Sequence, residues 1–179
     1  MSQEIEKPPS KLWLHELSDL LGWYQQNLCA AHLEDPRGHV LVFSLERFPH
    51  LIKLLRKDSD NEVSEPQKHV ARIRSGQSRN GDYGGYDQER AQTLSWIPAM
   101  IARPTMIVEV VERTLWEKPG DTVYLKQFNK GGYPFKALVC RRVGKERLAP
   151  ITCHPRSNGR VSKAYKIVWS PETAKTTTE

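Results

Sequence analysis

Hydrophobic residues near the N-terminus recur at steps of three and four positions, the period of an amphipathic helix. The pattern predicts a helix that Ser10 caps and that ends near Ala31, with apolar positions Leu12, Trp13, Leu17, Leu20, Leu21, Tyr24 and Leu28. A brief apolar run at 39–43 predicts a strand, and the segment 48–55 predicts a short amphipathic helix or a docking segment.

A second long helical pattern begins after Asp87, a suitable N-cap, and continues to Arg103. Pro98 lies inside this pattern and predicts a kink or an early break. The segments 57–66 and 75–87 are polar or rich in Gly, Asn and Asp, which is typical of exposed loops.

From residue 105 onward the period becomes that of extended chain. Five apolar or alternating runs separated by Gly, Pro or Asn turns predict an antiparallel meander: 105–112, 122–128, 135–142, 148–154 and 165–169. The predicted fold class is α+β, with N-terminal helices packed on a four- to five-stranded antiparallel sheet. The predicted domains are a helical extension at 1–36, one globular domain at 37–170 and a disordered tail at 171–179.

Composition excludes several classes of protein. The chain has 179 residues, of which 38% are hydrophobic and 27% charged, as in an ordinary globular domain. Its apolar stretches are too short to cross a bilayer, and its first residues lack the apolar core of a signal peptide. The three cysteines form no Cys-x-x-Cys pair, and an odd number cannot close a disulfide framework. These features favour the cytoplasm, without membrane association.

Charge is divided unevenly along the chain. Residues 1–68 carry 8 basic and 11 acidic side chains, whereas residues 120–170 carry 11 basic and 2 acidic ones, a net charge of +9 for that segment. A basic segment of this kind is typical of surfaces that bind polyanions, although it also serves solubility. The sequence therefore favours nucleic acid as a partner.

Common metal and phosphate motifs are absent from the sequence. It contains no P-loop, no HExxH, no EF-hand loop and no GxSxG elbow, and its six histidines do not occur in ligand spacing. We therefore expect neither a metal site nor a cofactor.

Alternation along the predicted strands suggests a chemical surface. Tyr124 and Lys126 share one strand face, and they point outward if the intervening apolar residues face the helices. Thr152 and His154 share one face of a later strand. A concave sheet face bearing Lys, Thr, His and Tyr would bind phosphate and stabilise developing charge. The alternative is a solvated face with ordinary Lys and Thr side chains.

The order of several segments resembles the phage and bacterial members of the barnase/EndoU/colicin/RelE-like nuclease superfamily (BECR fold). These segments are FPHLIKL at 48–54, ERAQTLSWIPAMIARP at 89–104, DTVYLKQF at 121–128, FKALVCRRV at 135–143 and RLAPITCHP at 147–155. The resemblance spans roughly residues 39–170, and the order of the segments is more specific than any one of them. It implies helices followed by a four-stranded antiparallel sheet.

The resemblance implies a metal-independent, toxin-type endoribonuclease of the kind that phages or mobile elements carry. In such enzymes the ribose 2′-OH attacks its own phosphate and leaves a 2′,3′-cyclic phosphate, which requires a base, an acid and cations. The positions that match the pattern are His50, Lys53, Lys126 and Thr152, with Tyr124 beside them. The resemblance implies that Lys126 neutralises phosphate charge, that Thr152 hydrogen-bonds phosphate and that His50 does acid/base work.

His69 and His154 compete with His50 for the acid/base role, because the unperturbed pKa of histidine lies near neutrality. The basic residues expected to bind nucleic acid are Arg72, Arg74, Lys136, Arg141, Arg142 and Lys163. The expected substrate is RNA, tRNA included, with an acidic immunity or antitoxin protein as a further partner. Two other functions stay open: a non-catalytic RNA- or DNA-binding accessory protein, and an interaction protein with an acidic partner.

Overall fold

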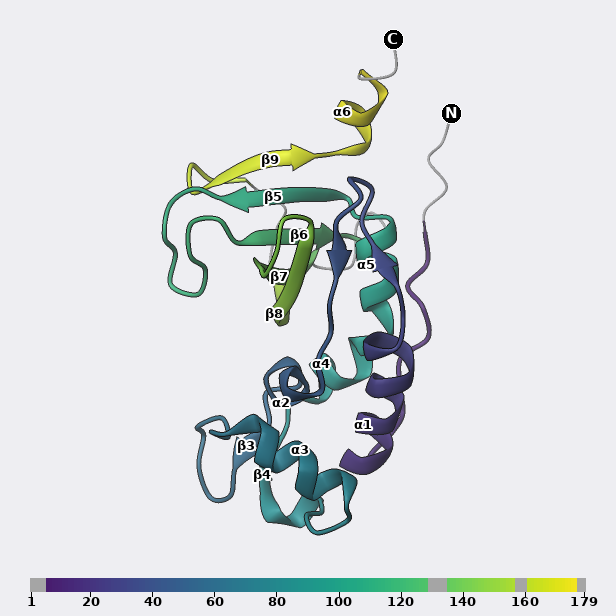
Figure 1. Ribbon diagram of the computed structural model, residues 1–179, viewed down its shortest axis with the longest axis vertical. Helices are drawn as coiled ribbons and strands as arrows, with labels where there is room; N and C mark the ends of the chain where they lie inside the picture. The colour runs from purple at the N-terminus through teal and green to yellow at the C-terminus, as the bar shows by residue number, and fades with distance from the viewer. Residues whose placement is uncertain (1–5, 129–134, 157–160, 177–179) are drawn as a thin grey trace. The chain divides into compact units, whose positions relative to one another are not determined.

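The computed structural model describes residues 6–128, 135–156 and 161–176. The chain divides into two compact units, each built from separate stretches of sequence (Figure 1). The unit that we call the sheet unit comprises Met1–Pro9, Leu33–Leu41 and Trp96–Glu179. The unit that we call the helical unit comprises Ser10–His32 and Val42–Ser95. The chain therefore passes from one unit to the other four times.

Short helices and a small two-stranded sheet form the helical unit. Its elements are α1 (Leu17–Tyr24), the π-helix η1 (Gln25–Cys29), η2 (Leu45–Arg47), α2 (Phe48–Leu51), β3 (Leu55–Arg56), α3 (Pro66–Arg74), η3 (Asn80–Asp82), β4 (Tyr83–Gly85) and α4 (Gln88–Gln92). β3 pairs antiparallel with β4. The core gathers around the fully buried Tyr24, whose ring centre lies 5.5 Å from that of Phe48. The helix α1 therefore contributes its apolar face to this core.

The first helix begins later than the sequence pattern predicts. Residues before Leu17 are not helical; the backbone N–H of Leu12 donates to the carbonyl of Gln92 (2.9 Å), and Trp13 is 68% exposed. The side chain of Asn80 accepts a hydrogen bond from the N–H of Leu17 (2.9 Å). Because a residue distant in sequence satisfies this helix end, the local Ser10 signal was misleading.

The second helical pattern is divided as the proline predicts. Asp87 caps α4, because its carboxylate accepts a hydrogen bond from the N–H of Arg90 (3.0 Å). The chain then forms the 3-10 helix η4 (Thr93–Trp96) before α5 (Ile97–Ala102) begins with Pro98 in its first turn. Proline lacks an amide hydrogen, so it is accommodated where no intrahelical partner is needed.

A seven-stranded mixed sheet dominates the sheet unit and confirms the α+β class. Its strands, in spatial order, are β1 (Leu33–Glu34), β2 (Val40–Leu41), β8 (Arg147–Arg156), β7 (Phe135–Arg142), β6 (Thr122–Lys126), β5 (Met106–Val110) and β9 (Tyr165–Trp169). The five predicted strands are present. The sheet is larger than the predicted four to five strands and is not purely antiparallel, because β2 runs parallel to β8.

The two additional strands enclose the Asp35-Pro36-Arg37-Gly38 turn. Gly38 adopts φ +85°, a conformation that suits glycine, and β1 then pairs antiparallel with β2. β2 lies within the strand predicted at 39–43, whereas β1 was not predicted, because a two-residue strand is too short to show alternation. The pairing of β2 with β8 places residues 33–41 in the sheet unit, across the boundary expected near residue 36.

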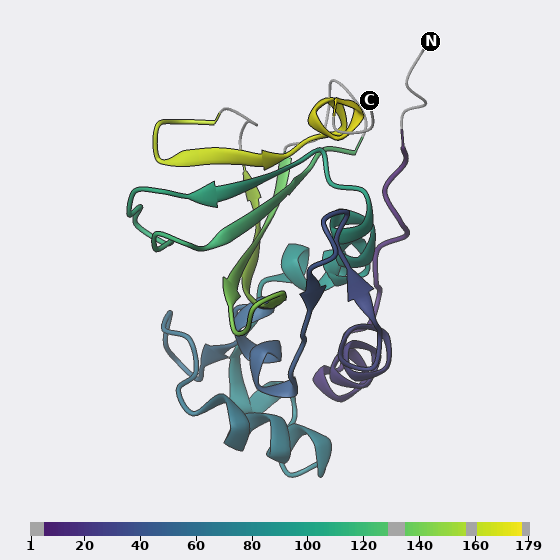
Figure 2. The same cartoon turned by 45° about the horizontal axis from the view of Figure 1, so that its top comes forward.

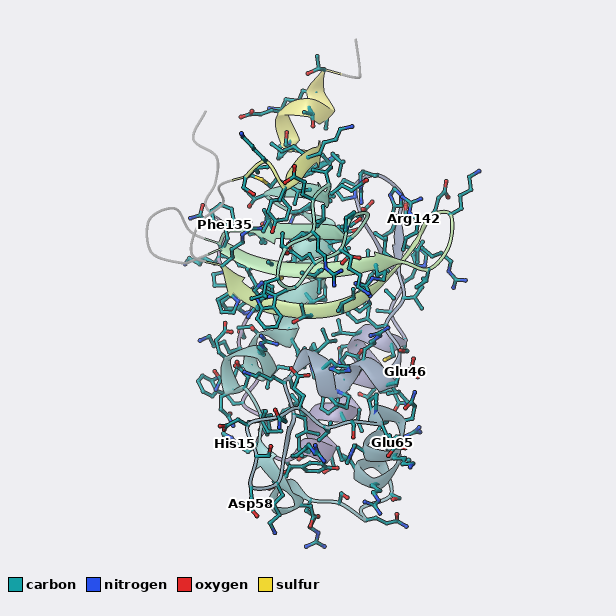
Figure 3. All side chains as sticks on the ribbon, turned by 90° about the vertical axis from the view of Figure 1, so that its left-hand side faces the viewer. His15, Glu46, Asp58, Glu65, Phe135 and Arg142 are labelled. Atoms are coloured by element: carbon teal, nitrogen blue, oxygen red, sulfur yellow. The ribbon has the colours of Figure 1, made fainter. Side chains whose placement is uncertain are left out.

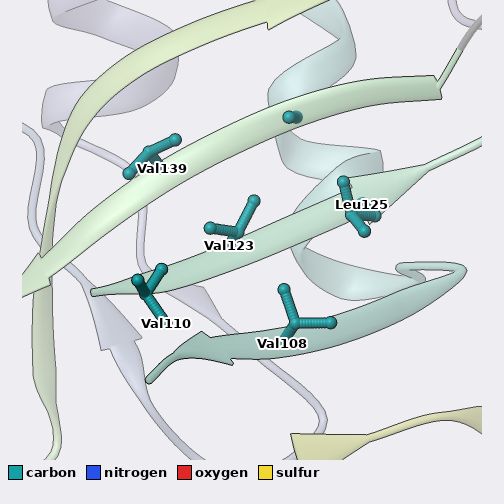
Figure 4. Packing of buried hydrophobic residues seen from close by; sticks show 6 residues of the cluster. Val108, Val110, Val123, Leu125 and Val139 are labelled. Carbon is teal, nitrogen blue, oxygen red and sulfur yellow. The ribbon is translucent and has the colours of Figure 1, made fainter. Parts of the chain in front are cut away.

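The central strands carry different side chains on their two faces. Six buried residues form an apolar cluster on one face: Val108, Val110, Val123, Leu125, Ala137 and Val139. Figure 4 shows them projecting from one side of β5, β6 and β7, with α5 behind the strands. The opposite face, which we call the packed face, carries Tyr124 and Lys126; the Lys126 Nζ atom contacts the Arg103 carbonyl, just after α5.

The sheet curls toward its apolar cluster. In a flat sheet β8 and β9 would lie about 19 Å apart, since four strand spacings separate them. Instead the guanidinium carbon of Arg156 on β8 lies 4.7 Å from the ring centre of Tyr165 on β9. The change in strand direction is visible in Figure 2, and Figure 3 shows β7 bowed between Phe135 and Arg142. We call this side the concave face.

Residues 171–175 fall in the segment expected to be disordered, yet they form α6 (Pro171–Lys175). A capping box stabilises its start, because the Ser170 hydroxyl accepts a hydrogen bond from the N–H of Thr173 (3.2 Å). Within the described ranges, no helix combines the length and apolar character needed to cross a membrane.

Candidate functional site

Three polar side chains from β8 lie in a row on the concave face. Thr152, His154 and Arg156 alternate along the strand, and His154 pairs with Ala137 of the apolar cluster. Side chains of paired residues share a face, and alternate residues of a strand are about 7 Å apart. The row therefore presents a hydroxyl, an imidazole and a guanidinium along one line, all partly exposed.

A tyrosine–carboxylate pair lies beside the end of this row. Tyr165 pairs with Val110, so its ring lies on the concave face, where the Arg156 guanidinium covers it. The Tyr165 hydroxyl donates a hydrogen bond to Oε2 of Glu117, which is 6% exposed. Thr114 Oγ1 donates to the same oxygen (2.8 Å). The two donors compensate the burial of this carboxylate.

The phenol of Tyr165 keeps its proton at neutral pH. Burial raises its pKa above the usual value near 10, and the hydrogen bond to the Glu117 carboxylate raises it further, against an opposing effect of Arg156. Tyr165 is therefore a hydrogen-bond donor and not a proton acceptor at neutral pH.

The apolar cluster lies beside these groups on the same face of the sheet. Its six side chains are at most 1% exposed, and five further apolar or aromatic side chains pack against them: Met106, Phe135, Ile151, Val161 and Tyr165. Electrostatic interactions are stronger beside such a surface than in bulk water. The arrangement offers a proton-transfer group, a cation and hydrogen-bond donors, which together can bind and polarise a phosphodiester.

Lys126 does not belong to this site, and the expectation that it faces outward is wrong. It is 6% exposed on the packed face, where its Nζ atom contacts Oε2 of Glu6 at 2.5 Å and the carbonyl of Arg103. The nitrogen also lies 5.2 Å from the ring centre of Phe128. The lysine is buried because a segment about 120 residues earlier in the chain supplies its counter-charge.

Replacing Lys126 by Met is expected to destabilise the fold by about 2 kcal/mol, the usual loss for hydrogen bonds to a charged group. Chemical denaturation measures the effect. A variant as stable as the wild type would contradict this structural role.

Tyr124 is also structural, and not a neighbour of a phosphate site. It is fully buried on the packed face, and its hydroxyl donates to Oδ2 of Asp35 (2.8 Å). The Asp35 carboxylate, itself inaccessible, also accepts hydrogen bonds from Arg37 Nη2 (2.7 Å) and the N–H of His39 (3.0 Å). This network holds the β1–β2 turn in place.

The predicted nucleic-acid residues of the sheet unit differ in their accessibility. Lys136 is only 3% exposed and lies opposite Lys126 on the packed face, so it is not an exposed phosphate contact. Arg141 donates from Nε to Asp121 Oδ1 (2.9 Å), whereas Arg142 and Lys163 are exposed. Arg142 donates to the Lys145 carbonyl. Arg142 and Lys163 therefore remain available as basic surface residues.

The other predicted residues belong to the helical unit. The Nδ1 atom of His50 lies 2.8 Å from the Glu62 carboxylate, and the exposed Lys53 adopts φ +53°. His69 contacts the Tyr83 hydroxyl (3.2 Å). The remaining two, Arg72 and Arg74, are exposed on α3. None of these five residues belongs to the concave sheet face.

Small pockets open in the helical unit. One of them, of about 280 Å³, is lined by His15, Leu17, Asn80, Tyr83, Gly85, Tyr86 and Gln88. Asn80 already bridges the carbonyl of His15 and the N–H of Leu17 there. The pocket thus surrounds the connection that starts α1, which gives its polar groups a structural role.

Sequence reasoning missed Arg156, Tyr165 and Glu117. Arg156 continues the alternation of Thr152 and His154, so extending the predicted strand by two residues would have included it. Glu117 carried no signal, because it lies in a connection between strands and becomes part of the site only through Tyr165.

In the described part of the chain, no three His, Cys, Asp or Glu side chains gather in a group that could hold a metal ion. Comparison with family models, with curated proteins and with solved structures finds no match to this chain.

Proposed function

We propose that the protein is an endoribonuclease that cleaves RNA by transesterification on the concave face of its sheet. The observation that supports this function best is the row formed by Thr152, His154 and Arg156, which aligns a hydroxyl, an imidazole and a guanidinium beside an apolar cluster. These are the groups that a phosphodiester requires for hydrogen bonding, proton transfer and charge neutralisation.

In the proposed reaction the ribose 2′-oxygen forms a bond to the neighbouring phosphorus while the bond to the 5′-oxygen breaks. The 2′-hydroxyl loses its proton to His154, and the leaving 5′-oxygen takes a proton from solvent water. The products are a 2′,3′-cyclic phosphate and a 5′-hydroxyl. Holding the nucleophile and the phosphate in one molecule makes this step effectively unimolecular.

Arg156 carries the charge of the phosphate in this proposal. Its guanidinium is fixed over the Tyr165 ring, and a cation held in position stabilises negative charge without reorganising during the reaction. Tyr165 is in turn fixed by Glu117, so the carboxylate is a positioning residue for the cation. Thr152 hydrogen-bonds a non-bridging phosphate oxygen.

The purified protein is expected to cleave total RNA and tRNA in excess EDTA, because the nucleophile is the substrate's own hydroxyl and not metal-activated water. The 3′ ends are expected to carry cyclic phosphate, measured by mass spectrometry of the fragments. A single 2′-deoxy sugar at a mapped cleavage position is expected to abolish the cut there. Cleavage of that deoxy substrate would contradict the mechanism.

Two outcomes would favour the alternative functions. Binding of RNA without any cleavage would indicate an accessory nucleic-acid-binding protein. Failure to bind or cleave RNA would favour an interaction protein with an acidic partner, such as an immunity or antitoxin protein.

A further inference from the structure

An exposed tryptophan stands next to the buried carboxylate of the site. In the connection from β5 to β6, Leu115 is 84% and Trp116 is 75% exposed, whereas the following residue, Glu117, is 6% exposed. Indole is a large, amphipathic ring, and its burial against a partner is energetically favourable. An exposed indole beside a candidate site therefore suggests a ligand surface.

Hydrogen bonds fix the loop both before and after Trp116 in the chain. Before the tryptophan, the N–H of Thr114 donates to the carbonyl of Glu117 (3.2 Å), and its hydroxyl donates to the carboxylate. After it, the N–H of Lys118 donates to the carboxylate of Asp121 (2.9 Å). The loop backbone thus presents the indole to solvent in a defined place.

The anchoring of this loop brings the indole to the site. Glu117 is bonded to Tyr165, whose ring the Arg156 guanidinium covers, and consecutive Cα atoms are about 3.8 Å apart. Trp116 therefore lies at the margin of the concave face.

Cationic side chains accompany the exposed indole. Arg113 and Lys118 flank it in the loop and are exposed; Glu112 is the exposed acidic side chain of the same loop. Proteins that bind single-stranded nucleic acid combine cations that follow the backbone with aromatic rings on which bases stack.

We propose that Trp116 stacks on an unpaired base of single-stranded RNA whose phosphate lies over the concave face. The proposal rests on the proposed function for its ligand class, and it adds a preference for unpaired nucleotides. A duplex keeps its bases stacked on one another, so it offers the indole no free base face.

Binding is measured by fluorescence anisotropy with a labelled, mixed-sequence single strand made entirely of 2′-O-methyl nucleotides, which cannot be cleaved by this mechanism. Trp116→Ala is expected to raise Kd by about 5- to 150-fold, the loss of one base–aromatic stack. Trp116→Phe is expected to retain much of the affinity. The matched control is Trp13→Ala, at another exposed tryptophan (68%), which is expected to bind like the wild type.

The outcomes separate this inference from the proposed function. If the wild type cleaves RNA and Trp116→Ala binds the single strand unchanged, stacking is overturned and the nuclease stands. An equal loss of affinity for the single strand and for a duplex of the same chemistry also overturns stacking. A wild type that binds and cleaves no RNA overturns both, and leaves a protein partner as the occupant of the exposed patch. Thermal denaturation of each variant confirms that the fold is retained.

Discussion

Replacing His154 by Ala is expected to lower the rate of RNA cleavage by about 10²- to 10⁴-fold, because the proposed reaction loses its proton-transfer group. Melting temperature is expected to change little, since the imidazole is partly exposed on the concave face and leaves no core cavity. The measurement is kcat/KM on a short RNA with a mapped cleavage site, with thermal denaturation of the same samples.

The matched controls are His50→Ala and His69→Ala, which remove imidazoles from the helical unit. Both are expected to cleave at the wild-type rate. Full activity of the His154 variant would exclude its role in proton transfer, and a large loss in either control would transfer that role to the helical unit.

Replacing Asp35 by Asn is expected to lower the free energy of unfolding by about 3 kcal/mol at pH 7, because the buried carboxylate is the acceptor of an entire network. In the variant an amide NH₂ replaces one carboxylate oxygen. This group is itself a donor, so it cannot accept the hydrogen bonds that Arg37, His39 and Tyr124 donate at this position. The matched control is Asp60→Asn, an exposed position where a change below about 0.5 kcal/mol is expected.

The loss of unfolding free energy in Asp35→Asn is expected to become smaller as the pH falls. Burial by itself raises the pKa of Asp35, but hydrogen bonds from Arg37, Tyr124 and the backbone of His39 outweigh it, so its pKa lies below the usual value. A carboxyl whose pKa is lower in the folded than in the unfolded protein stabilises the fold at pH values above the unfolded pKa of about 3.9. That stabilisation disappears as the pH falls through the folded pKa. The difference between wild type and Asp35→Asn is thus expected to shrink below about pH 4 in urea unfolding. A constant difference from pH 7 to pH 3 would contradict the role of the charge.

The alternation of residues predicted correctly which side chains of one strand share a face. It did not predict which side chains of different strands lie on the same face of the sheet. Tyr124 and Lys126 lie together, as do Thr152 and His154, yet the register places the two pairs on opposite faces. A shift of one residue in pairing exchanges the faces, and the sequence of one strand contains no information on that register.

Burial of charged residues was equally inaccessible to local patterns. Lys126 is covered because Glu6, which precedes the first predicted helix, reaches it. Conversely, the position of Arg156 follows from simple alternation beyond Pro155, and only the sheet curl that brings it to Tyr165 needed the structure. Long-range pairing, and not local propensity, decided which residues form the site.

The interleaving of the two units has a consequence for folding during synthesis. Residues of the helical unit are complete once Ser95 has left the ribosome, whereas β2 must wait for its partner β8, more than a hundred residues later in the chain. Contacts between such distant segments slow folding, because the entropy of closing the loop precedes the gain from pairing. The helical unit can therefore fold while later residues are still being synthesised, whereas the concave face can form only after β8 and β9 have left the ribosome.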